Sequence, residues 1–207
     1  MGNKFAEIAF TDTVKAVQER FGSRKSYARM AEGEASFNNV LGPREAAFIA
    51  ERDSFYMASV SETGWPYVQH RGGPNGFVRV LDEKTIGFAD FRGNRQYVSV
   101  GNLIKDDRAS LFFMDYANRT RLKLLGRVKL IGPADQAVLA RLEVPGYRAR
   151  VERGMLITVE AFDWNCPQHI TQRFTLEQVE QLALPLRQRI AELESQLAAA
   201  RRLEKAE

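Results

Sequence analysis

The spacing of apolar residues is helical before residue 53, extended from there to about residue 164, and helical again after residue 175. Thr11 can cap a helix that ends near Gly22, because its side chain can accept a hydrogen bond from the first turn. The apolar positions of this helix follow helical spacing: Val14, Val17 and Phe21. Two more helices are predicted over Ser26 to Glu32 and from Pro43, which suits a first helical turn, to Arg52. We expect these helices to cover the main body of the protein.

Six extended segments follow, each rich in β-branched and aromatic residues and bounded by Gly, Pro, Asn or Asp. They are Phe55 to Val60, Tyr67 to Arg71, Phe77 to Leu81, Thr85 to Ala89, Arg108 to Tyr116 and Arg121 to Ile131. Six strands with short turns predict a closed or nearly closed antiparallel barrel, so the expected fold class is mainly β, with added helices (α+β). A helix from Gln96 to Lys105 interrupts the series and must cross one end of the barrel. A helix from Pro133 to Leu142 and a strand from Met155 to Trp164 should follow.

The C-terminal segment is predicted to be a long amphipathic helix. Thr175 and Gln178 have the spacing of a capping box. Beyond them, apolar residues repeat at spacings of four and three: Leu186, Ile190, Leu193, Leu197 and Ala200. The pattern leaves two partners open for this stripe, the chain's own barrel and another subunit. The expected organisation is a helical segment over 1–42, a barrel domain over 43–174 and the C-terminal helix over 175–207.

Composition places the chain among ordinary globular proteins. Of its 207 residues 44% are apolar and 27% are charged, and the net charge is only +4. The arginines are scattered among acids and form no basic stripe, which disfavours nucleic-acid binding and suits a small anionic ligand. The single cysteine, Cys166, excludes an internal disulfide framework and a cysteine-rich metal cluster. Without a signal peptide or a membrane-spanning apolar run, we expect a cytoplasmic protein with no membrane partner.

The first candidate site is the loop Asp90-Phe91-Arg92-Gly93-Asn94-Arg95-Gln96, which joins a predicted strand to a predicted helix. Backbone N–H groups at a helix start, a glycine that allows close approach, and the guanidiniums of Arg92 and Arg95 together suit a phosphate group. A solvated turn with two surface arginines explains the same residues about equally well.

Two further clusters lie on predicted strands. In Tyr67-Val68-Gln69-His70-Arg71-Gly72-Gly73-Pro74, strand alternation places Gln69 and Arg71 on one face and Val68 and His70 on the other. The two glycines would let a planar ligand lie against the backbone. In Arg119-Thr120-Arg121-Leu122-Lys123, alternation places the three cations on one face. Half-exposed sheet faces with solvated charges explain either cluster taken alone.

The ordered set of motifs resembles the pyridoxamine 5′-phosphate oxidase-like family of FMN-binding split barrels. The motifs are Gln69-His70-Arg71-Gly72-Gly73, Phe88-Ala89-Asp90 with the phosphate loop, a helix with Asn102, Asp107-Arg108-Ala109-Ser110-Leu111-Phe112-Phe113, and Leu125-Gly126-Arg127-Val128. The chain is most similar to the flavin-nucleotide-binding branch of that superfamily. That branch has an N-terminal segment like Phe10-Thr11-Asp12 to Tyr27-Ala28-Arg29 and a tail like Phe162-Asp163-Trp164-Asn165-Cys166-Pro167-Gln168-His169-Ile170.

The resemblance implies an FMN-binding homodimer with two flavin sites at the subunit interface. It places Gln69, His70 and Arg71 along the isoalloxazine and ribityl chain, Asn94, Arg95 and Gln96 at the phosphate, and Arg121 where a polar residue reaches the flavin, often from the partner subunit. The full set of candidate cofactor-binding residues is Gln69, His70, Arg71, Gly72, Asp90, Arg92, Asn94, Arg95, Gln96, Asn102 and Arg121. The resemblance therefore implies an FMN-dependent oxidoreductase acting on a small molecule, with a nicotinamide as one possible electron donor.

Several alternatives stay open. The C-terminal segment that clamps substrate phosphate in the true pyridoxamine phosphate oxidases has no counterpart here, which argues against vitamin B6 oxidation. A non-catalytic flavin- or haem-binding protein is the main rival, and a deazaflavin-binding protein is a third option. His70 is the candidate proton donor, although a lone strand histidine is more often a packed residue. Pro167 between Cys166 and His169 favours a structural turn over a nucleophile and base, and no metal site is expected.

Overall fold

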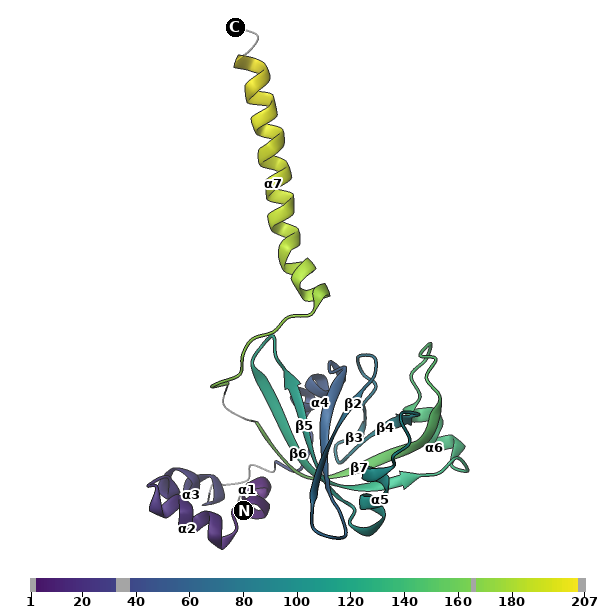
Figure 1. Ribbon diagram of the computed structural model, residues 1–207. Coiled ribbons are helices and arrows are strands. Elements are labelled where there is room, and N and C mark those ends of the chain that lie inside the picture. Colours follow the sequence, from purple (N-terminus) through teal and green to yellow (C-terminus); the bar gives the residue numbers. More distant parts are fainter. Residues whose placement is uncertain (1–2, 33–37, 165–166, 205–207) are drawn as a thin grey trace. The chain divides into compact units, whose positions relative to one another are not determined.

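A computed structural model describes residues 3–32, 38–164 and 167–204. The chain forms two compact units. The first consists of Met1–Asp115 and Thr120–Gln168 and contains the β-sheet, and the second consists of Tyr116–Arg119 and His169–Glu207 and contains the long C-terminal helix (Figure 1).

The first unit is built on one strongly curved seven-stranded sheet (Figure 1). Its strands are β1 Ser54–Val60, β2 Pro66–Gly72, β3 Arg79–Asp82, β4 Thr85–Phe91, β5 Arg108–Asp115, β6 Thr120–Ile131 and β7 Val151–Trp164. Their order is β2-β1-β5-β6-β7-β4-β3, and every neighbouring pair is antiparallel. Strands β2 and β3 are the two edges, so the barrel is split rather than closed. The expected mainly β split barrel with added helices is confirmed.

Alternation along the strands supplies the core. In β5 every second residue is buried, and in β1 Phe55, Met57 and Ser59 point inward. Aromatic rings fill the centre: Phe55 lies 5.0 Å from Phe113 and 5.3 Å from Phe88, measured between ring centroids. Such aromatic pairs add to the area-dependent stabilisation of the core.

Within the described residues of the first unit, six helices accompany the sheet. They are α1 Lys4–Ala9, α2 Asp12–Arg20, α3 Arg24–Glu32, α4 Pro43–Ala50, α5 Val98–Lys105 and α6 Gln136–Leu142. Thr11 caps α2 as expected, with its side chain accepting from the backbone N–H of Val14 at 3.3 Å. Glu45 ties α4 to the sheet, because its carboxylate accepts from the indole N–H of Trp164 at 2.7 Å and from the backbone of Gly42 at 3.0 Å.

Several elements differ from the sequence prediction; α5, for example, begins at Val98 rather than Gln96, and β7 begins at Val151 rather than Met155. Helix α1 was not predicted, because it has only six residues and depends on Asn3, whose side chain accepts from two backbone N–H groups of the first turn. Strand β3 begins at Arg79 rather than Phe77, because Phe77 and Val78 turn into the core after a turn that starts at Pro74. Helix α6 begins three residues after Pro133.

The second unit contains α7, Leu176–Glu204, a helix of 29 residues. The predicted capping box is confirmed: the backbone N–H of Thr175 donates to Gln178 Oε1 at 2.9 Å, and that of Gln178 donates to Thr175 Oγ1 at 3.2 Å. Over residues 3–32, 38–164 and 167–204, no helix combines the length and the apolar character needed to cross a membrane.

Gly126 marks a point where the sheet admits no side chain. It lies at a register shift between β6 and β7, and a Cβ there would lie 2.6 Å from Ile157 Cγ2 and 2.7 Å from the carbonyl oxygen of Thr158. We expect Gly126→Ala to lower the free energy of unfolding by about 1 to 3 kcal/mol, because the bulge must open to admit the methyl group. Urea denaturation measures this change.

Gly132→Ala is the matched control, because a Cβ at Gly132 meets nothing within 4 Å. If the two substitutions had equal effects, the close approach of Ile157 and Thr158 would not be the reason for a glycine at position 126.

Candidate functional site

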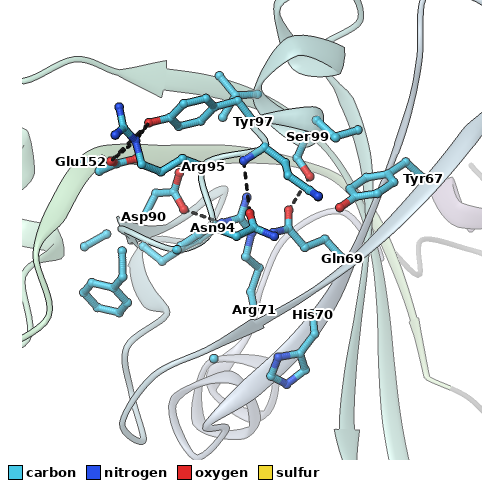
Figure 2. A pocket seen from close by; sticks show the side chains of 18 of the residues that line it. Tyr67, Gln69, His70, Arg71, Asp90, Asn94, Arg95, Tyr97, Ser99 and Glu152 are labelled. Atoms are coloured by element: carbon cyan, nitrogen blue, oxygen red, sulfur yellow. Dashed lines mark hydrogen bonds and ion pairs between the residues drawn. The ribbon is translucent and has the colours of Figure 1, made fainter.

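One cavity of about 310 Å³ lies beside the edge strand β2 (Figure 2). Strand β2 forms one wall, and the end of β4, the following loop and the start of α5 form the other. Glu152 reaches it from β7. The residues that line it are Tyr67, Gln69, His70, Arg71, Gly72, Phe77, Phe88, Ala89, Asp90, Phe91, Gly93, Asn94, Arg95, Gln96, Tyr97, Val98, Ser99, Val100 and Glu152.

The β2 wall follows the predicted alternation. Gln69 and Arg71 are partly buried on the cavity side, whereas Val68 and His70 are exposed on the other side. Ser99, in the first turn of α5, donates from its hydroxyl to Gln69 Oε1 at 2.7 Å. The amide oxygen of Gln69 is therefore occupied, so its NH₂ group is the part that a ligand can meet.

Buried charges form the back of the cavity. Asp90 is 8% exposed at its side chain, pairs with Arg71 and lies 3.2 Å from the Nε of Arg153. Burial raises the pKa of the Asp90 carboxyl, although the nearby guanidiniums of Arg71 and then Arg153 act to lower it. Within the described part of the chain, the buried Nε of Arg71 has no hydrogen-bond partner. The cavity wall therefore carries a donor that the rest of the described chain leaves unused.

The loop before α5 is held in a strained shape. Arg95 and Tyr97 are not glycines, yet their φ angles are +62° and +56°. The guanidinium of Arg95 donates to the Tyr97 hydroxyl at 2.9 Å, and that hydroxyl donates to Glu152 at 3.3 Å (Figure 2). Residues in this backbone region cost free energy and persist where their surroundings fix them, which is common at ligand sites.

The start of α5 is open toward a ligand. Its N-cap residue, Tyr97, makes no side-chain capping hydrogen bond. A Cβ at Gly93 would meet nothing within 4 Å, so there is free space beside that residue. Asn94 closes the turn by accepting from the backbone N–H of Gln96 at 3.2 Å. The loop thus has the features expected of an anion site: cationic Arg95, backbone donors and space.

The structure brings eight of the eleven candidate binding residues to this cavity. They are Gln69, His70, Arg71, Gly72, Asp90, Asn94, Arg95 and Gln96. Arg92, Asn102 and Arg121 do not line it. Arg92 lies 3.8 Å from Glu152. Asn102 is buried and donates to Ser59 at 3.0 Å. Arg121 lies on β6, with its guanidinium 5.7 Å from the centre of the Phe112 ring.

The His70 ring is directed away from the charged cluster (Figure 2). It packs edge-on against Tyr56 at 5.6 Å between ring centroids, on the outer side of the sheet. The expectation that the two glycines leave room for a planar ligand is wrong at Gly73, because a Cβ there would lie 2.7 Å from the Phe77 ring. At Gly72, a Cβ would lie 3.1 Å from His70 Cε1. Packing within the chain accounts for Gly73, whereas Gly72 lines the cavity.

Sequence reasoning missed four residues of this site. Tyr97 and Ser99 directly follow the loop that was predicted to bind phosphate, and Ser99 lies in the first turn of the predicted helix, which is a recognisable signal. Glu152 and Arg153 gave no signal. They reach the site because β7 pairs with β4, with Arg153 opposite Asp90. That pairing joins segments about sixty residues apart.

No group of three or more potential metal ligands is assembled among the residues that the structure describes. Cys166 lies outside those residues, so the predicted turn at this cysteine is not described.

Comparison with known proteins identifies the family. A family model described as pyridoxamine 5′-phosphate oxidase matches residues 41–161. No curated protein matches the chain. The fold is similar to HupZ of Group A Streptococcus, with 14% identity, a TM-score of 0.45 and coverage of 65% of this chain and 100% of that one.

Two further solved structures are similar. A protein from Clostridium acetobutylicum related to general stress protein 26 has 16% identity and a TM-score of 0.44, covering 65% of this chain and 93% of that one. An FMN-binding protein from Syntrophomonas wolfei has 11% identity and a TM-score of 0.41, covering 75% and 96%. Because the family model spans more than half of the sequence, the chain belongs to the pyridoxamine 5′-phosphate oxidase family.

Proposed function

We propose that the chain binds FMN in the cavity beside β2 and acts as an FMN-dependent oxidoreductase on a small molecule. The observation that carries this proposal is the convergence of three donor groups on one cavity. They are the guanidinium of Arg71, the NH₂ group of Gln69 and the guanidinium of Arg95 at the start of α5. When bound, FMN supplies the redox chemistry, and the protein supplies its binding and orientation.

The phosphate end of FMN fits the loop before α5. Arg95 provides a charge-assisted donor, and the first turn of α5 provides backbone N–H groups that no side chain caps. The partial positive charge of a helix N-terminus favours an anion at this point. The Gly93 side of the loop has free space for the phosphate oxygens.

The ring end of FMN fits the β2 wall. Strand β2 is an edge strand that pairs only with β1, so alternate backbone N–H and C=O groups have no partner in the sheet. These groups, with Gln69 and Arg71, can hydrogen-bond the polar edge of a flavin. Fixed donors of this kind stabilise negative charge that develops on the atoms they contact. The role of the β2 wall is therefore to orient the ring and to favour its reduced form.

A homodimer is the second part of the proposal. The outer face of the β1–β2 hairpin exposes Tyr56, Val60 and Val68, of which Val68 is 61% exposed. The Nε of Arg121 is buried and lacks a hydrogen-bond partner within the described residues. The exposed apolar face indicates a surface that another molecule covers, and the unpaired Arg121 donor is a buried polar group that the single chain leaves unsatisfied.

We expect the wild-type chain to sediment as a dimer, and we expect Val68→Glu to weaken both dimerisation through the β1–β2 face and FMN binding, because the charge would be buried in the interface. Ile104→Glu is the matched control, since Ile104 is also an exposed aliphatic residue but lies on α5. A wild-type monomer that binds FMN at full affinity would refute the dimer.

Purified protein tests the function directly. The expected preparation is yellow, releases FMN on denaturation as identified by mass, and bleaches when NADH or NADPH is added under anaerobic conditions. Two negative results would together favour a non-catalytic carrier: neither NADH nor NADPH reduces the bound flavin, and no tested substrate reoxidises the flavin after dithionite has reduced it. A Soret band without flavin would show that the cofactor is haem rather than FMN. Release of a deazaflavin would show that the cofactor is a deazaflavin.

A further inference from the structure

Helix α7 carries an apolar stripe that the rest of its own unit, over the described residues, leaves exposed. Its 29 residues span about 43 Å at the helical rise of about 1.5 Å per residue. Leu186 is 67% exposed and Ile190 is 55% exposed, although both are large aliphatic residues. Single exposed leucines are common on protein surfaces, but a continuous apolar row is typical of a helix that packs against a partner.

The stripe follows a seven-residue repeat along the whole helix. One position of the repeat is occupied by Leu176, Ala183, Ile190 and Leu197. The second position, three residues further along, is occupied by Val179, Leu186, Leu193 and Ala200. Two apolar positions spaced three and four residues apart over four repeats are the pattern of a coiled-coil seam. Pro185 falls outside both positions and so adds no residue to the seam, although it removes one backbone hydrogen bond inside the helix.

Charged residues flank this seam in a second seven-residue pattern. Each residue that directly follows the second apolar position is charged, and the signs alternate: Glu180, Arg187, Glu194 and Arg201. Side chains at this flanking position pair across the seam with the partner helix and set its orientation. The alternating charges therefore favour one relative orientation of two paired helices over the other.

An antiparallel pair of α7 helices satisfies both patterns in one register. With Leu186 level with Leu197 of the second copy, Ile190 meets Leu193 and Ala183 meets Ala200. In the same register Glu180 faces Arg201, and Arg187 faces Glu194. Sliding one helix by seven residues would place Glu180 opposite Glu194. In a parallel pair the flanking row would face Leu182, Arg189 and Gln196, which offer a single charge.

We propose that α7 pairs with α7 of a second copy of this chain as an antiparallel two-helix coiled coil, in the register just described. This inference rests on the second unit alone and does not depend on FMN binding.

Disulfide trapping in the full chain tests the register. In a Cys166→Ser background, the double variant Leu186→Cys with Leu197→Cys is compared with each single variant under copper phenanthroline oxidation. Within one helix these positions are eleven residues, or about 16 Å, apart, too far for a disulfide, which needs Cα atoms within about 7 Å. The proposal requires efficient chain-to-chain crosslinks in the double variant and few in either single variant.

Each other outcome overturns the proposal. Efficient crosslinking of the single variants would show a parallel pair, and no crosslinking of any variant would show that the stripe has another partner. Circular dichroism of the full chain confirms that each variant is folded.

Charge reversal gives a second readout that leaves the apolar seam unchanged. Arg187→Glu should lower the crosslinking yield of the double-cysteine chain several-fold, and adding Glu194→Arg should restore it, because opposite charges again face one another. Arg202→Glu makes the same charge change one position away from the flanking row and should leave the yield unchanged. Equal yields for Arg187→Glu and Arg202→Glu would contradict the register.

Discussion

Asp90→Ala should lower the free energy of unfolding by about 3 to 5 kcal/mol, which we expect to be the largest effect of any substitution at the site. The alanine would leave the guanidiniums of Arg71 and Arg153 buried without their shared carboxylate. Removing one partner of a buried ion pair costs more than the pair itself contributes, because the remaining charge stays desolvated. Urea denaturation at neutral pH measures the loss, and thermal denaturation provides an independent check.

Asp90→Asn is the matched control for size and shape, since it keeps an oxygen that can accept from Arg71. We expect it to destabilise the protein less than alanine does. If Asp90→Ala and Asp90→Asn both left the free energy of unfolding unchanged, the ion-pair cluster around Asp90 would not stabilise the cavity wall.

The pH dependence of these variants has a defined sign. Burial raises the pKa of Asp90 above its ordinary value of 3.8, so between 3.8 and the raised pKa the folded state binds more protons than the unfolded state. The wild type should therefore lose stability as the pH rises through this window, and Asp90→Asn should lack that loss. If the wild type and Asp90→Asn lost the same stability over this pH range, titratable groups other than Asp90 would be responsible for the loss.

Arg95→Ala should weaken FMN binding roughly ten- to 150-fold while leaving the fold intact, which is the largest expected effect on the ligand. Arg95 is exposed, its guanidinium lies beside the open start of α5, and its hydrogen bond to Tyr97 is local to the loop. Losing a charge-assisted contact to phosphate has an effect of this size. Fluorescence titration of the apoprotein with FMN measures the affinity, and riboflavin, which lacks the phosphate, should bind both proteins about equally.

Arg141→Ala is the control, because Arg141 is another exposed arginine in the last turn of α6 and does not line the cavity. Unchanged FMN affinity in a folded Arg95→Ala variant would contradict the proposal that this loop binds the phosphate.

The architecture could be predicted from the sequence because it depends on local patterns. Runs of β-branched and aromatic residues bounded by turn residues predicted the strands, and the predicted alternation of Gln69 and Arg71 against Val68 and His70 matches the burial pattern of β2. The strand-to-helix loop was located from its Gly, Asn and Arg residues for the same reason. Each of these signals is contained within about ten consecutive residues.

The remainder of the site depends on contacts between distant segments. The charged cluster around Asp90 needs Arg153, which only the pairing of β7 with β4 places opposite it. Asn102 was a candidate ligand-binding residue, but a polar side chain on a helix can equally satisfy a buried hydroxyl, as it does with Ser59. A single sequence does not distinguish these two roles, because both require a polar residue at the same position.

The Glu152 carboxylate has a consequence for ligand discrimination. It lies 3.8 Å from Arg92 and 3.9 Å from Arg95, so both cations of the loop already have an anionic neighbour. Any incoming anion must compete with this internal carboxylate for them. A doubly charged phosphate monoester competes better than a singly charged carboxylate or a neutral ligand, because the attraction scales with charge. In the proposed FMN complex, Glu152 would therefore be an intramolecular competitor that sets a selectivity threshold, at the cost of absolute affinity.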